Sequence, residues 1–273
     1  MNHRMRSGLH AMFRGVRLAL HLAYGMLLAI PYPHFPQKRQ RRILKIWSRQ
    51  LLAILDVGVR IEGTQPARGE SACLIVANHV SWLDIFVLNA VQPSRFIAKS
   101  EVRTWPLIGW LCQRGGTIFI ERALRRDAAA VNRRVAELLE QGICIALFPE
   151  GTSTDGRQVG HFHSALIQPA IDAHVRLCPI ALRYRDEDGE YSDAPAYIGD
   201  MTLSDSLWRI LRSPRFDALL AFPPALATAG ENRRVLACAA QEAIAQELEN
   251  KSAASPQETA DDARMLPGTV AVP

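Results

Sequence analysis

The sequence predicts an α/β fold with a mixed, largely parallel sheet flanked by helices, preceded by an N-terminal helical hairpin that associates with a membrane. Three observations support this. Short apolar, β-favouring runs alternate with helical patterns after residue 57, an order typical of parallel sheets. The chain has 273 residues, 48% of them hydrophobic, enough for a sizeable core. The first 60 residues carry a net charge of +10, although the whole chain carries only +5.

Residues 1–56 are predicted to form the basic, amphipathic hairpin. Leu18 to Ile30 is apolar except for His21, and it is shorter than the roughly 20 residues that span a bilayer. We therefore expect a helix that lies in the membrane interface, with an ordinary packing helix as the alternative. Gln37 to Asp56 has apolar residues at helical spacing, and its opposite face is basic, with Arg39, Arg42, Lys45 and Arg49.

The basic N-terminal region indicates an anionic partner, either nucleic acid or a membrane surface. Its many Leu, Ile, Ala and Trp residues favour a membrane with anionic lipids and argue against nucleic acid. The cysteines lack metal-ligand spacing, and three lie in predicted strands, which indicates buried, reduced thiols. We expect the protein at the cytoplasmic face of the inner membrane. The cysteines are Cys73, Cys112, Cys144, Cys178 and Cys238.

Residues 57–250 are predicted to form the α/β domain. Its expected strands are 57–62, 72–77, 95–98, 117–120, 143–148, 175–184 and 216–222. Helical patterns follow at 85–88, 105–112, 124–141, 164–173 and 231–249, and Pro169 should kink or shorten the fourth. Residues 251–273 have little apolar periodicity and are predicted not to fold.

His79 and Asp84 form the first candidate catalytic pair. His79 lies where a buried strand ends, and Asp84 lies five residues later in the first turn of a helix. Such loops commonly hold the chemistry of α/β sheets. A neutral imidazole can take a proton from an alcohol, and a carboxylate can fix its tautomer. The alternative is structural, because Ser81-x-x-Asp84 also reads as a helix capping box.

Polar groups accompany three other predicted strands. They are Glu121-Arg122, Glu150-Gly151-Thr152 and Leu177-Cys178-Pro179. Each has an ordinary alternative: a surface charge, a plain turn and an edge-strand proline. Together with His79 and Asp84, they predict a functional site at the strand ends.

These residues resemble the four sequence blocks of the glycerolipid acyltransferase family. Asn78-His79-x4-Asp84 matches the first block, and Gly116-x-x-x-Ile120-x-Arg122 matches the second. Phe148 to Thr152 matches the third block, Phe-Pro-Glu-Gly-Thr, and the stretch around Pro179 matches the fourth. The blocks occur in order and at family-like spacing, and the resemblance runs from about residue 47 to residue 184.

The resemblance implies acyl transfer from a thioester of coenzyme A or acyl carrier protein to the hydroxyl of a lysolipid. It implies that His79 is the general base and Asp84 its orienting partner. No acyl-enzyme is needed, because the substrate alcohol is itself the nucleophile. The thioester is a cosubstrate, and neither a further cofactor nor a metal ion is expected.

The resemblance also implies substrate-binding roles. Arg122, Glu150 and Gly151, with Thr152 in the same block, are expected to hold the headgroup of the acceptor, since arginine donors suit a phosphate. Pro179 is expected on the side of the acyl donor.

Two departures from the family pattern concern the acceptor. Ser153 follows Thr152 where the family often has arginine, and His163 stands where a lysine is common. The resemblance indicates a 1-acyl-sn-glycerol-3-phosphate acyltransferase. Family members that acylate lyso-ornithine lipid, which lacks phosphate, resemble this pattern, so lyso-ornithine lipid is the alternative acceptor.

Two other classes of function would account for parts of the sequence. A metal-dependent hydrolase could use His79 and Asp84 as ligands, but only Asp155 and His161-x-His163 offer further ligands nearby. A non-catalytic membrane-binding module would explain the basic N-terminus and leave the four ordered blocks unexplained.

Overall fold

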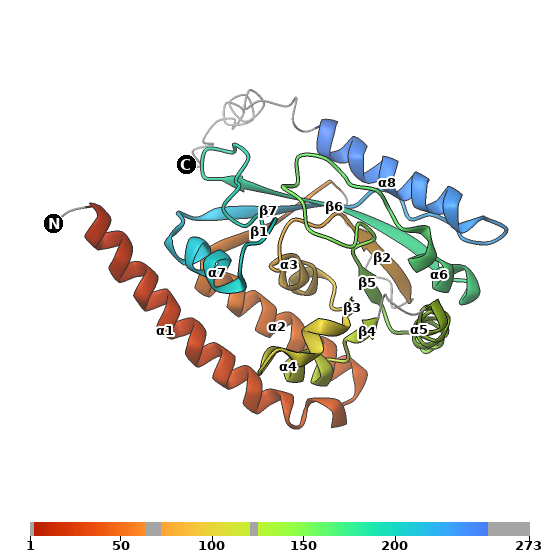
Figure 1. The fold of residues 1–273 in the computed structure, drawn as a ribbon, viewed down its shortest axis with the longest axis horizontal. Helices are drawn as coiled ribbons and strands as arrows, with labels where there is room; N and C mark the ends of the chain where they lie inside the picture. Colours follow the sequence, from red (N-terminus) through yellow and green to blue (C-terminus); the bar gives the residue numbers. More distant parts are fainter. Residues whose placement is uncertain (1–2, 64–71, 121–124, 251–273) are drawn as a thin grey trace, which may run out of the picture.

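Seven strands form one sheet in the order β1-β7-β6-β2-β5-β3-β4 (Figure 1). The computed structural model describes residues 3–63, 72–120 and 125–250. Only β6 and β7 pair antiparallel within this sheet of described strands, which confirms the predicted mixed, largely parallel sheet. All seven predicted strands are present: β1 (Val57–Glu62), β2 (Cys73–Ala77), β3 (Arg95–Lys99), β4 (Ile118–Ile120), β5 (Ile145–Leu147), β6 (Arg176–Asp186) and β7 (Phe216–Ala221).

Helices cover both faces of the sheet (Figure 1). Helices α1, α2, α3 and α7 pack on one face, and α5, α6 and α8 on the other, because successive residues of the buried strands point to opposite sides. The helices are α1 (His3–Ala29), α2 (Gln37–Leu55), α3 (Asp84–Val91), α4 (Ile108–Arg114), α5 (Arg125–Glu140), α6 (Gln168–Asp172), α7 (Leu203–Arg212) and α8 (Arg233–Asn250), with short 3-10 turns η1 (Tyr32–His34), η2 (Ser100–Thr104) and η3 (Ser164–Leu166).

The N-terminal segment forms the predicted helical hairpin, and it shares a buried cluster with the sheet. Ala11 and Leu18 of α1 and Leu51 of α2 are buried in that cluster. The ring of His21 stacks on Trp47 at 4.8 Å between centroids, which joins the two helices. No helix in the described ranges is both long enough and apolar enough to span a bilayer.

Three expectations about helices need correction or comment. Helix α1 begins at His3, well before the expected Leu18, and its N-terminal half places Ala11 against the protein. The expected helix at 164–173 is divided into η3 and α6, and Pro169 lies in the first turn of α6. Helix α7 was not predicted. The tail 251–273 lies outside the described residues.

The strands bring two of the cysteines together. Cys73 and Cys144 lie 3.8 Å apart between sulfur atoms, although 71 residues separate them in sequence. Both are buried and reduced, as expected from the apolar runs that contain them.

Candidate active site

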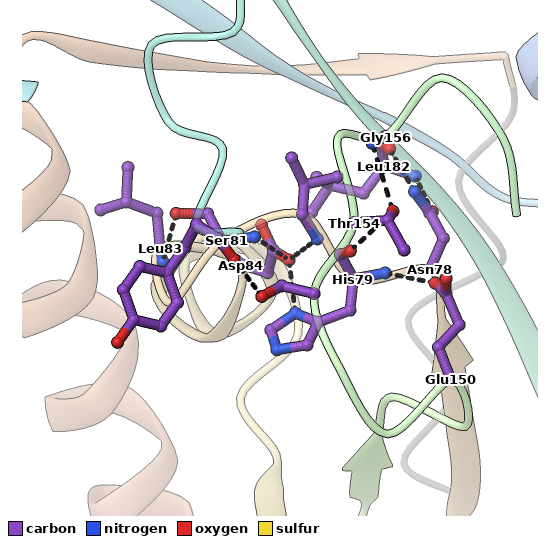
Figure 2. A network of polar contacts seen from close by, with 12 residues as sticks. Asn78, His79, Ser81, Leu83, Asp84, Glu150, Thr154, Gly156 and Leu182 are labelled. Carbon is purple, nitrogen blue, oxygen red and sulfur yellow. Dashed lines mark hydrogen bonds and ion pairs between the residues drawn. The ribbon is translucent and has the colours of Figure 1, made fainter. Parts of the chain in front are cut away.

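His79 and Asp84 meet at the carboxyl end of β2. The imidazole Nδ1 lies 2.8 Å from Asp84 Oδ2 (Figure 2). The Asp84 side chain is fully buried, whereas 20% of the His79 side chain is exposed. An ionised carboxylate only accepts hydrogen bonds, so Nδ1 donates and carries the proton of the neutral ring. The other ring nitrogen, Nε2, is then left with a free lone pair that can accept a proton.

Asp84 also holds the loop that carries His79. Its Oδ2 accepts hydrogen bonds from the backbone N–H groups of Val80 at 2.7 Å and Ser81 at 2.9 Å. The predicted capping box does not form, because helix α3 begins only at Asp84 with Leu83 as its N-cap, and the Ser81 hydroxyl accepts from Leu83 N. The bond from Ser81 N to Asp84 instead holds the loop before the helix. A structural role of Asp84 in this loop and a catalytic role are therefore compatible, because the same oxygen serves both.

Tyr184, in the interior of β6, is a further partner that sequence reasoning missed. Its hydroxyl donates to Asp84 Oδ1 at 2.7 Å, and the ring is almost fully buried. Burial, together with the negative charge of Asp84, raises the pKa of Tyr184 well above its ordinary value, so the phenol stays a donor. With this bond, both oxygens of Asp84 are engaged.

Glu150 joins the loop that carries His79 to the segment that carries Gly160. Its Oε1 accepts from His79 N at 2.7 Å, and its Oε2 accepts from Gly160 N at 2.8 Å. Burial raises the pKa of Glu150, and the two backbone donors oppose that rise. Glu150 was predicted to hold the acceptor headgroup. In the structure both of its oxygens accept from backbone N–H groups, one of them that of His79, and its role toward the headgroup stays a prediction.

Phe148 and Thr154 complete the support of the histidine. The Phe148 ring stacks on the imidazole at 4.0 Å with 8° between the planes. Thr154 N donates to the carbonyl of His79 at 2.8 Å. Phe148 and Glu150 of the third sequence block, and Thr154 two residues beyond it, therefore fix the orientation of His79; Figure 2 shows Glu150 and Thr154 against its backbone.

Of the other predicted site residues, the structure describes Gly151, Thr152 and Pro179. Gly151 and Thr152 lie in the turn after β5, directly following Glu150, and Thr152 is exposed. Pro179 is buried inside β6 opposite Val76, and it lies neither at a strand end nor on an edge strand. Arg122 lies outside the described residues.

The two histidines considered as metal ligands are exposed on the segment after the third block. His161 and His163 have ring centroids 5.6 Å apart, and the backbone of His163 donates to the carbonyl of Pro149. In the described part of the chain, no three His, Cys, Asp or Glu side chains lie close enough together to hold a metal ion. At His79 and Asp84 the structure shows a direct contact between an imidazole and a buried carboxylate.

Comparisons with known proteins agree with this geometry. Residues 58–183 match the acyltransferase family profile. The chain is 43% identical over 176 residues to the 1-acyl-sn-glycerol-3-phosphate acyltransferase of Neisseria meningitidis, covering 64% of this chain and 68% of that protein. It is 37% identical over 244 residues to the lyso-ornithine lipid O-acyltransferase of Pseudomonas aeruginosa, covering 86% and 92% respectively.

A solved structure shows the same fold. The crystal structure of the 1-acyl-sn-glycerophosphate acyltransferase of Thermotoga maritima superposes with a TM-score of 0.62 at 20% identity, covering 89% of this chain and 99% of that one. The sequence relatives and the family profile establish more than the fold. The chain belongs to the acyltransferase family and is itself an acyltransferase.

Proposed function

We propose that the protein transfers a fatty acyl group from a thioester of coenzyme A or acyl carrier protein to the free hydroxyl of a lysolipid. The observation that carries this proposal is the His79–Asp84 pair, in which Nδ1 is held and Nε2 is left as a base. The names of the relatives, which acylate lysophosphatidic acid or lyso-ornithine lipid, support the substrate class.

The proposed reaction is a direct attack. His79 Nε2 takes the proton of the lysolipid hydroxyl while its oxygen attacks the thioester carbonyl. The new C–O ester bond forms, and the C–S bond breaks as the tetrahedral intermediate collapses. The imidazolium, stabilised by the buried Asp84, then returns the proton to the leaving thiolate. The histidine ends in its starting state, and no acyl group is attached to the enzyme.

We assign the acceptor headgroup to the turn that contains Gly151 and Thr152, together with Arg122 from the second block. The position of the turn supports this assignment, because it directly follows Glu150, which accepts a hydrogen bond from the backbone of His79. Pro179 remains our proposal for the acyl-donor side, where its effect must pass through the packing of β6 against β2.

We further propose that lyso-ornithine lipid, or another acceptor with a less anionic headgroup, competes well with lysophosphatidic acid. Ser153 replaces the family's frequent arginine, and its hydroxyl donates to the carbonyl of Tyr197, so it offers no positive charge. His163 replaces a lysine. In a site without these cations, too little positive charge offsets the cost of taking a phosphomonoester out of water. The match over 92% of a lyso-ornithine lipid acyltransferase supports the same conclusion.

The ratio of kcat/KM for the two acceptors, measured with one donor, tests this assignment. We expect lyso-ornithine lipid to equal or exceed lysophosphatidic acid. Ser153→Arg with His163→Lys should shift the ratio toward lysophosphatidic acid, and Ser153→Gln with His163→Gln provides an uncharged control. A preference of the natural enzyme for lysophosphatidic acid of more than about tenfold, or 1.4 kcal/mol, would contradict the proposal.

We also propose that the outer face of α1 lies in a membrane interface rich in anionic lipids. Large apolar side chains are exposed along this face, while Ala11 and Leu18 on the other side are buried. Arg17 and Arg39 are exposed nearby in sequence and supply positive charge. We place this interface at the cytoplasmic face of the inner membrane, which the free thiols support. The exposed apolar residues of α1 are Leu9, Met12, Phe13, Val16, Leu20, Tyr24 and Leu27.

The triple variant Met12→Gln, Phe13→Gln and Leu20→Gln should weaken binding to lipid vesicles at least tenfold in a pelleting assay, because each side chain loses apolar area that the interface would bury. Point variants are preferable to deletion of α1, since Ala11 and Leu18 belong to the core. A control changes three exposed apolar residues elsewhere, Ile61, Ile198 and Val235, to glutamine. Equal binding by both variants would exclude the α1 face.

A further inference from the structure

A polar pocket lies at the opposite end of the parallel strands from His79. It has a volume of about 440 Å³ and lies between the turn that joins α1 to α2 and the end of α4. Arg95 begins β3 and Gly116 precedes β4, whereas His79 follows β2 and Glu150 follows β5. These strands are parallel, so the pocket and the catalytic pair are separated by the length of a strand, on the order of 15 Å for five residues. The lining includes Tyr32, Gln40, Arg95, Trp110, Arg114 and Gly116.

Two arginines give the pocket a positive charge. Arg95 is half-buried, and burial is the main cause that lowers its pKa; the nearby Tyr32 opposes this shift and the nearby Arg134 adds to it. Within the described ranges, neither Arg95 nor Arg114 forms an ion pair with a carboxylate. A partly desolvated guanidinium is costly unless a negative group accompanies it. An anionic ligand would supply that group.

The walls of the pocket are built to hold this arrangement. Gly116 has a φ of +81°, and a Cβ there would lie 2.8 Å from Arg95 Nε, so the glycine makes room for the guanidinium. Gln40 Nε2 donates to the carbonyls of Tyr32 and Phe35, at 3.2 and 2.9 Å, which fixes the turn between the helices. Arg114 lies over the Trp110 ring at 5.4 Å. The site is therefore largely formed before a ligand arrives.

The surroundings indicate what kind of anion would reach the pocket. Trp110 is 36% exposed, and Leu107 and Trp105 on the neighbouring segment are 62% and 39% exposed. Helix α4 contacts α1, whose last turn is followed by the exposed Ile30. A ligand with a negative headgroup and apolar chains fits a positive pocket beside exposed apolar side chains. A small free anion would make no contact with these exposed apolar side chains.

We propose that this pocket binds the phosphodiester headgroup of an anionic phospholipid, as a docking site separate from the acceptor site. The two arginines would contact the phosphate oxygens, with the fork of Arg95 suited to two of them. The lipid chains would lie along Trp110 and Leu107. This inference rests on the proposed membrane interface of α1, and it adds a headgroup preference that exposed apolar residues alone would not produce.

Vesicle binding by the full-length protein tests the proposal. We expect at least tenfold tighter binding to phosphatidylcholine vesicles that contain 20 mol% phosphatidylglycerol than to phosphatidylcholine alone. Arg95→Gln with Arg114→Gln should remove most of that preference. The control, Arg233→Gln with Arg234→Gln on α8, removes the same charge from exposed positions elsewhere and should lose less than twofold. Arg95→Lys keeps the charge and loses the fork, so we expect an intermediate loss.

Quenching of Trp110 fluorescence by a short-chain phosphatidylglycerol below its micelle concentration identifies the ligand directly, with Trp110→Phe to assign the signal. Saturable quenching that the double variant abolishes supports the proposal, provided that thermal unfolding shows the variant folded. Quenching by inorganic phosphate or coenzyme A without quenching by the lipid would overturn it. Equal loss by the double variant and its control would overturn it as well. If the wild-type protein binds both kinds of vesicle equally well, only this pocket is refuted. If it binds neither kind, the α1 interface is refuted too.

Discussion

His79→Ala is expected to lower kcat for acyl transfer by about 10² to 10⁴-fold, the usual cost of removing a general base. The hydroxyl of the acceptor would then lose its proton only to water. The fold should persist, because Asp84 keeps its bonds from Val80, Ser81 and Tyr184. Steady-state transfer from a labelled acyl thioester to a lysolipid measures the effect.

A matched control for this variant is His161→Ala. His161 is an exposed histidine on the segment after the third sequence block, and its described ring contact is with His163. We expect it to keep kcat within a few-fold of the natural enzyme. If His79→Ala retained more than a tenth of natural turnover, His79 would not be the base.

Asp84→Asn is expected to reduce kcat by about 10² to 10⁴-fold with a much smaller change in KM. The asparagine carbonyl can replace Oδ2 as acceptor for the loop and for His79 Nδ1, and its amide can face the Tyr184 oxygen. The geometry is thereby kept, and what is lost is the negative charge that stabilises the imidazolium. A loss confined to KM would contradict this role.

Tyr184→Phe separates positioning from charge. The substitution leaves the His79–Asp84 bond and removes the donor to Asp84 Oδ1. Leaving a buried carboxylate oxygen without this partner should lower the free energy of unfolding by about 1 to 3 kcal/mol. We expect kcat to fall about tenfold or less, well short of Asp84→Asn. Thermal unfolding and steady-state rates of the natural enzyme, Tyr184→Phe and Asp84→Asn check this order of kcat values.

Local patterns predicted most of the sheet and the contact between His79 and Asp84. The runs that became β2 and β5 are apolar throughout, as expected of strands buried on both faces. His79 and Asp84 are five residues apart on one loop, so their contact follows from local geometry. The resemblance to the acyltransferase family rested on the same short blocks, and the comparisons confirm it.

Contacts between distant residues could not be predicted in this way. Tyr184 lies 100 residues from Asp84, and nothing in its apolar strand distinguishes its hydroxyl from that of an ordinary core tyrosine. Glu150 reaches His79 N only because β2 and β5 are neighbours in the sheet. The pairing order decides both contacts, and one sequence does not reveal it.

The missed helix α7 did carry a local signal. Thr202 accepts a hydrogen bond from Asp205 N, and its hydroxyl donates to the Asp205 carboxylate, so Thr202-x-x-Asp205 marks the start of the helix. The extent of α1 is different, because its described first half shows exposed apolar residues on one side and the buried Ala11 on the other. That pattern becomes clear only once both surroundings, protein and proposed membrane, are recognised.

The central claim is direct attack by the acceptor hydroxyl, with His79 as base and no acyl-enzyme. Rapid mixing of excess enzyme with a labelled acyl thioester, with and without lysolipid, tests it most directly. We predict that release of the thiol requires the lysolipid, that it slows by about 10² to 10⁴-fold in His79→Ala, and that the intact mass of the enzyme never increases by an acyl group. A burst of thiol release without acceptor, accompanied by an acylated protein, would contradict the account.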